Sequence, residues 1–136
     1  MRLPAALADA LVAHAREEFP NECCGLIAGQ DGTATRVLRA VNSEGSPFMY
    51  VMEPREQMQL MDEIDEAGED LLAIYHSHTR SAAYPSTTDV DLAFFAEPLY
   101  VIVSLQDDAN PVIRAFHLER SAPTGEQITE EVVEPA

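Results

Sequence analysis

An apolar run that ends in two histidines constrains the fold of this chain more than any other feature. Residues Asp70-Leu-Leu-Ala-Ile-Tyr75 lead directly into His76-Ser77-His78. A short apolar run that follows an acidic turn predicts a buried β-strand. Side chains two residues apart on a strand point to the same face. We therefore expect His76 and His78 to lie together on one face of a sheet, with Ser77 on the other.

The segment that follows predicts a loop and then a helix. Residues Thr79 to Thr88 are mostly small and polar and include one proline, which is typical of a loop. Ser86 is a favourable N-cap for a helix from Thr87 to Phe95, and Asp89 falls in the first turn of that helix. A loop that returns from the end of the strand can bring this carboxylate back to the two imidazoles.

Together, His76, His78 and Asp89 have the composition of a metal site. Two imidazoles and one carboxylate are three ligands of the kind that a catalytic zinc uses, which leaves a fourth position for water. Taken singly, each histidine could be a packed residue at a strand end, and Asp89 could simply stabilise the helix dipole. The hydroxyl of Ser86 could serve in capping or in catalysis. One metal geometry satisfies all three ligand positions, so the spacing points to a hydrolase.

The rest of the chain predicts one domain, residues 1–136, of the α/β (α+β) class. A chain of 136 residues with 46% hydrophobic content can bury a substantial core. Apolar residues at helical spacing predict an amphipathic helix from Pro4 to Glu18, and a second helical pattern begins at Pro54. The remaining patterns are a turn at Gly29 to Gly32, an acidic edge strand or tail at Glu126 to Glu134, and strands at Cys24–Ala28, Thr35–Val41, Phe48–Met52, Leu99–Ser104 and Val112–Leu118.

Composition excludes two classes of partner. The net charge is −16 and all eight basic residues are arginines, so the chain would repel the phosphates of a nucleic acid. No apolar run approaches the length of a membrane span, and charged residues interrupt the N-terminal helix where a signal peptide would be apolar. We expect a cytoplasmic protein. The adjacent Cys23 and Cys24 suggest buried thiols on a strand rather than a disulfide framework or zinc ligands.

Three motifs resemble the JAMM, or MPN-plus, zinc metallopeptidase family, over about Pro20 to Ser104. They are His76-Ser-His78, Pro85-Ser86-Thr-Thr-Asp89 and Pro20-Asn-Glu22-Cys-Cys-Gly-Leu-Ile-Ala-Gly29. The resemblance implies an MPN domain, with a central, mostly antiparallel, curved β-sheet flanked by about three helices. It also implies one Zn²⁺ per chain, held by His76, His78 and Asp89. In the family pattern Glu22 is the general acid/base and Ser86 steadies the tetrahedral intermediate. Without the resemblance, Glu22 could be a solvated carboxylate before a strand.

The residue after the second histidine narrows the resemblance. The family usually has proline there, whereas this chain has Thr79, as in a group of actinobacterial hydrolases that free cysteine from the C-terminus of a small sulfur-carrier protein. A small ubiquitin-like sulfur carrier is therefore the implied partner and substrate, with Thr79 and Tyr84 as substrate contacts; Tyr84 could equally have a packing role. Two alternatives stay open: a JAMM protease that trims or deconjugates another ubiquitin-like protein, and a non-catalytic MPN scaffold. The sequence does not predict an oligomeric state.

Overall fold

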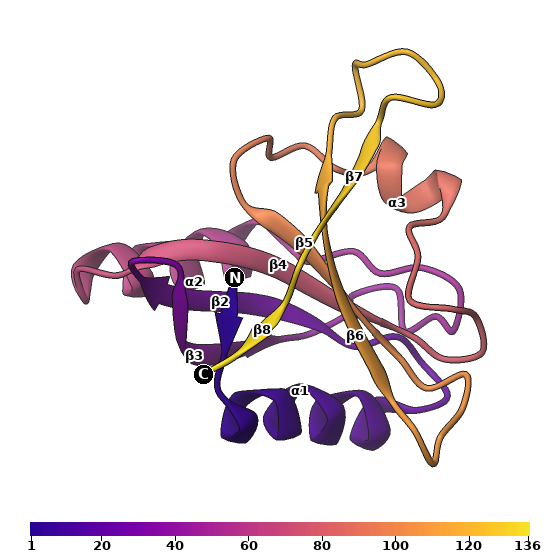
Figure 1. Ribbon diagram of the computed structural model, residues 1–136, viewed down its shortest axis with the longest axis horizontal. Coiled ribbons are helices and arrows are strands. Elements are labelled where there is room, and N and C mark those ends of the chain that lie inside the picture. The colour runs from indigo at the N-terminus through magenta and orange to yellow at the C-terminus, as the bar shows by residue number, and fades with distance from the viewer.

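The computed structural model describes residues 1–136 as one curved, eight-stranded sheet with three helices (Figure 1). The helices are α1 (Ala5–Glu18), α2 (Pro54–Glu66) and α3 (Thr87–Asp91). The strands are β1 (Arg2–Leu3), β2 (Cys24–Gln30), β3 (Thr33–Ala40), β4 (Asp70–His78), β5 (Leu99–Ser104), β6 (Val112–Leu118), β7 (Ile128–Glu131) and β8 (Glu134–Pro135).

The strand order is β7-β6-β5-β4-β2-β3-β1-β8, which puts β4 in the interior of the sheet. The pairings β2 with β3, β2 with β4, β5 with β6 and β6 with β7 are antiparallel, whereas β4 with β5 and the two short pairings of β1 are parallel. Pairing of β1 with β8 brings the two chain termini close together, as Figure 1 shows. The mostly antiparallel sheet with three helices is the predicted fold class.

Apolar residues cover both faces of the sheet because side chains alternate along each strand. On one face, Cys24 and Leu26 pack with Ile64 of α2 and with α3, and on the other face Cys23 packs with Leu11 of α1. Both cysteines are buried and free, as expected from the sequence. Residues of β4 belong to both cores, Ile74 to the first and Ala73 and Tyr75 to the second.

The connection from β4 to β5 explains how the loop returns to the strand end. A parallel pair needs a crossover that carries the chain back to the start of the second strand. Here residues 79–98 make that crossover, and α3 within it packs through Val90 onto the core face that also contains Ile74. His76 and His78 lie two and four residues after Ile74 on the same strand, so their side chains share its face of the sheet. They therefore point toward α3.

Two local predictions were wrong. The helix expected to reach Phe95 ends at Asp91, and the Phe95 amide donates to the Tyr100 hydroxyl at 3.1 Å instead of continuing the helix. The turn predicted within Gly29 to Gly32 is confirmed: it is confined to Asp31-Gly32, whose φ values of 52° and 77° suit a tight turn, and Gly29 and Gln30 extend β2.

The second wrong prediction concerns Phe48 to Met52, which forms no strand; only Met52 makes an isolated bridge, to Asn42. In contrast, the acidic C-terminal segment does contain an edge strand, β7, paired with β6. None of the helices has the length and apolar character needed to cross a membrane.

Candidate active site

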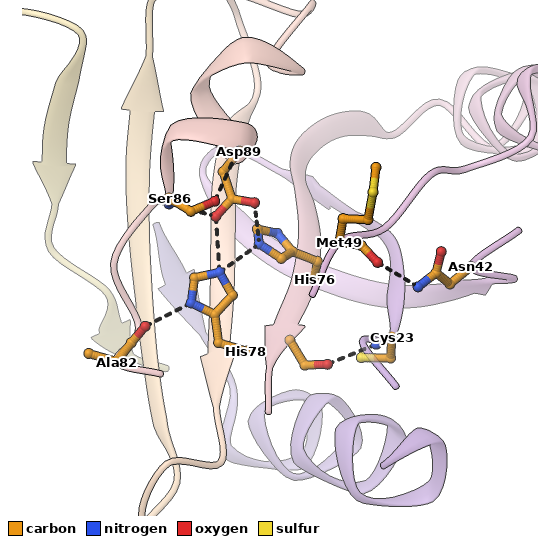
Figure 2. A network of polar contacts seen from close by, with 9 residues as sticks. Cys23, Asn42, Met49, His76, His78, Ala82, Ser86 and Asp89 are labelled. Carbon is orange, nitrogen blue, oxygen red and sulfur yellow. Dashed lines mark hydrogen bonds and ion pairs between the residues drawn. The ribbon is translucent and has the colours of Figure 1, made fainter. Parts of the chain in front are cut away.

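His76 and His78 lie at the carboxyl end of β4 and meet Asp89 of α3 (Figure 2). The His76 Nε2 atom lies 3.1 Å from Asp89 Oδ1, and the His78 Nε2 atom lies 2.9 Å from Asp89 Oδ2. The two Nε2 atoms are 3.2 Å apart. All three side chains are buried, with exposed fractions of 8% or less. The structure thus brings the three predicted ligands together.

The surroundings of the Nδ1 atoms of His76 and His78 bear on whether the cluster can hold a metal ion. His78 Nδ1 lies 2.8 Å from the Ala82 carbonyl oxygen, to which it can only donate, so the lone pair of a neutral ring is on Nε2. His76 is held by stacking on Tyr50, with ring centroids 4.6 Å apart, and its buried Nδ1 has no partner. Ligand atoms of His76, His78 and Asp89 lie within 4.8 Å of one another. Such converging lone pairs repel unless a proton or a cation lies among them, so the donor set fits a metal ion.

The charges in the cluster are set by burial and by Asp89. Burial lowers the pKa of His76, which keeps that ring neutral and able to bind a metal. Burial also opposes the charge on Asp89, but hydrogen bonds from both histidines and from the Ser86 amide outweigh it and hold the pKa of this carboxyl well below its usual range. For His78, the carboxylate and the Ala82 carbonyl outweigh burial and raise the pKa. A neutral His76 beside an ionised Asp89 is the state that metal ligation requires.

Ser86 fixes the position of Asp89 through a reciprocal cap at the start of α3. The Asp89 amide donates to Ser86 Oγ at 3.0 Å, and the Ser86 amide donates to Asp89 Oδ2 at 2.9 Å. The capping prediction for Ser86 is therefore confirmed. Because the cap uses only a lone pair of the hydroxyl, its proton stays free to donate to another group. Capping and a second role are compatible.

Glu22 lies beside the same site, next to β2, the strand that pairs with β4 on the side away from β5. It precedes β2 and lines, with His78 and Ser86, a pocket of about 430 Å³. Its backbone is fixed by bonds to the Ser46 carbonyl at 2.9 Å and from the Asn42 side chain at 3.1 Å. The side chain is 4% exposed, and its buried Oε1 has no hydrogen-bond partner. Burial is the largest cause that raises the pKa of Glu22 to about 8. Glu22 is thus a buried carboxyl group, not a solvated one.

The two residues predicted to contact substrate have different places. Thr79 is buried, lines the pocket and lies with its hydroxyl 3.4 Å from the Pro47 carbonyl. Tyr84 is half-exposed, packs edge-on against Phe116 at 5.6 Å and is absent from the pocket lining. For Tyr84 the structure favours packing; a substrate contact by Thr79 stays a prediction.

Sequence reasoning missed several contributors to the site. The Ala82 carbonyl orients His78, and Tyr50 stacks on His76. A main-chain acceptor leaves no signal in side-chain chemistry, and Tyr50 reaches the site from a loop without regular structure. Phe48 and Arg80 also line the pocket; the position of Arg80, two residues after His78, is the signal that could have identified it.

Comparisons with known proteins agree with this site. Residues 4–119 match the family described as prokaryotic homologs of the JAB domain. The chain is 39% identical to the CysO-cysteine peptidase of Mycobacterium tuberculosis over 124 residues, which cover 90% of this chain and 85% of that protein. It is 33% identical to a probable TtuB-protein conjugate cleaving protease of Thermus thermophilus, over 93% of this chain and 78% of that protein.

A solved structure shares the whole architecture. A Desulfitobacterium hafniense protein, solved in solution, has a TM-score of 0.87 and 32% identity. The match covers 99% of this chain and 92% of that one. The topology described above is therefore found in an independently determined relative.

Proposed function

Because the chain belongs to the prokaryotic homologues of the JAB domain, the JAMM family, we propose that it is a zinc peptidase that releases cysteine from a ubiquitin-like sulfur carrier. The bond cut follows the C-terminal glycine of that carrier. One observation carries the proposal: Glu22 lines the pocket beside the converging ligand atoms of His76, His78 and Asp89. The name of the mycobacterial relative supports the substrate class.

The three ligands define what a bound ion would contribute. His76 Nε2, His78 Nε2 and the Asp89 carboxylate would hold the ion, and zinc held by such ligands lowers the pKa of a water molecule to about 7 and polarises a carbonyl. A site of two imidazoles and a carboxylate also accepts other divalent ions, so the identity of the metal as zinc is part of the proposal.

Glu22 is assigned the proton transfers. General acid/base catalysis is most efficient when the pKa of the catalytic group lies near the working pH, and burial brings the pKa of this carboxyl to about 8. Its carboxylate takes a proton from the attacking water as the new C–O bond forms. It returns that proton to the departing nitrogen as the C–N bond breaks, which yields a carrier with a C-terminal glycine and free cysteine.

Ser86 is assigned to the oxyanion. Its hydroxyl proton is not used by the cap and can donate to the carbonyl oxygen as negative charge develops there. The same cap ties this hydroxyl to Asp89, so donor and ligand move together. The pocket lined by Glu22 and Ser86 is where the scissile carbonyl would lie.

The test uses a carrier extended by one cysteine, with CysO of M. tuberculosis as the probe. Zinc-loaded wild-type protein should shorten the adduct by one cysteine residue, as measured by intact-protein mass spectrometry. Glu22→Gln should retain the metal and lose turnover, whereas His78→Ala should lose both. An adduct that stays uncut by the zinc-loaded wild type would refute the substrate assignment.

A second candidate substrate is a carrier joined to a protein lysine. The name of the Thermus relative, a probable conjugate cleaving protease, supports this activity. The same residues would cut an isopeptide bond, and a lysine-linked conjugate assayed beside the cysteine adduct separates the two. A non-catalytic scaffold is disfavoured because every ligand position and the acid/base position are filled. The cytoplasmic location stays a prediction.

A further inference from the structure

Most arginines of this acidic chain have a polar partner within the structure. Four form ion pairs with carboxylates, and two donate hydrogen bonds to backbone carbonyls; these six are Arg16, Arg36, Arg39, Arg114, Arg2 and Arg120. Only Arg55 and Arg80 make neither kind of contact. Arg55 lies at the exposed start of α2 and lines none of the pockets described above. Arg80 therefore has a free guanidinium close to the candidate active site.

The position of Arg80 is defined by the strand that carries the metal ligands. It follows His78 by two residues and lines the pocket that also contains Glu22 and Ser86. It is the only lysine or arginine in that lining. It also borders a neighbouring pocket of about 530 Å³, in which Arg16 is paired with Asp108. Thr79 and Arg80 line both pockets.

A substrate that ends one residue beyond the cut would need such a cation. Its terminal α-carboxylate is separated from the scissile nitrogen by a single Cα atom, so it must enter the pocket together with the reacting bond. There it meets Glu22 and Asp89 in a chain of net charge −16. The proposed zinc ion offsets the charge of Asp89 but is used by the reacting carbonyl and water, so the α-carboxylate needs a cation of its own in this acidic chain. An arginine can bind it through two parallel hydrogen bonds.

We propose that Arg80 binds the free α-carboxylate of the residue that is released, which makes the enzyme selective for one-residue C-terminal extensions. This inference rests on the proposed function. It places the cysteine-releasing activity ahead of the deconjugating one, because a protein lysine linked to a carrier has no α-carboxylate next to the scissile nitrogen. Arg80 thereby sets specificity and takes no part in proton transfer.

The experiment compares two adducts that differ only at the end of the chain. One is CysO of M. tuberculosis extended by cysteine with a free carboxylate, and the other carries the same cysteine as a carboxamide. Zinc-loaded wild type should cleave the free acid with a kcat/KM about 10-fold higher, the lower end of what a charge-assisted hydrogen bond contributes. The preference should shrink in 0.5 M salt, because Arg80 is exposed.

Variants separate a direct contact from a general effect of charge. Arg80→Gln should abolish the preference by slowing only the free acid, and Arg80→Lys should keep part of it. Arg55→Gln, which removes the other free guanidinium, should leave it unchanged. The dissociation constants of both adducts for Glu22→Gln protein give a readout without turnover, in which the free acid should bind more tightly.

Equal cleavage of the two adducts by the wild type, or a preference that survives in Arg80→Gln, would overturn the role of Arg80 and leave the peptidase intact. If neither adduct is cut, the proposed function fails as well.

Discussion

Replacing Glu22 with Gln should stabilise the metal-free protein against unfolding and abolish the catalytic activity of the zinc-loaded protein. The carboxyl is 4% exposed, and burial raises its pKa from an ordinary 4.5 to about 8. At pH 7 the unfolded chain carries an ionised Glu22, whereas the folded chain must either protonate it or bury its charge. Each pH unit above the ordinary pKa costs about 1.36 kcal/mol, so the cost at pH 7 is at most about 3.4 kcal/mol. Solvent in the adjoining pocket reduces the expected value to about 1–2 kcal/mol.

The sign of the pH dependence makes this prediction specific. A carboxyl whose pKa is raised by folding contributes stability that is fully present below about 4.5 and lost as the pH rises through about 8. Urea unfolding of chelator-treated protein should therefore show Glu22→Gln more stable than wild type at pH 7.5, with the difference vanishing near pH 4.5.

The control is Glu66→Gln, on the exposed end of α2, which should change stability little at either pH. If Glu22→Gln is no more stable than wild type at pH 7.5, or if the gap does not depend on pH, the argument that burial tunes this carboxyl is refuted.

Three further predictions follow from packing, titration and the cap. Gly25→Ala should destabilise the fold by about 3 kcal/mol in urea unfolding, because the added Cβ would lie 2.5 Å from the Tyr75 ring; unchanged stability would contradict this. Burial lowers the pKa of His14, which lies 2.6 Å from the Tyr75 hydroxyl, to about 4, so its contribution to stability is lost as the pH falls from 6.5 through 4. The stability gap between wild type and His14→Gln should shrink by about 2 kcal/mol from pH 7 to pH 5, and a constant gap would argue against it. Ser86→Ala should lower kcat about 100-fold while zinc is retained, and loss of the metal instead would assign Ser86 only to the cap.

The clustering of His76 and His78 could be predicted because strand alternation is a strong local rule. Once Leu71 to Tyr75 forms a buried strand, the period of two places His76 and His78 on one face whatever surrounds them. Asp89 was harder, since its approach depends on the parallel pairing of β4 with β5 and on the crossover that this pairing requires. The capping signal at Ser86 was sufficient because it depends only on neighbouring residues.

The parts that were missed depend on contacts between distant segments. Beyond the end of α3, the Phe95 amide donates to the hydroxyl of Tyr100, a residue of the next strand. Phe48 to Met52 has the composition of a strand but only one residue with a bridge partner, and composition does not reveal partners. Tyr50 and the Ala82 carbonyl reach the histidines through tertiary packing, which short-range patterns do not encode.

The metal content of the purified protein tests the central claim most directly. Elemental mass spectrometry of wild type, Glu22→Gln and His78→Ala, each loaded with zinc and then dialysed, measures the ion per chain. About one zinc per chain in the first two proteins and almost none in His78→Ala is the expected result, since three ligands with an open position define a catalytic zinc site. Wild-type protein without metal, or zinc retained in His78→Ala, would contradict the assignment of His76, His78 and Asp89 as the metal site.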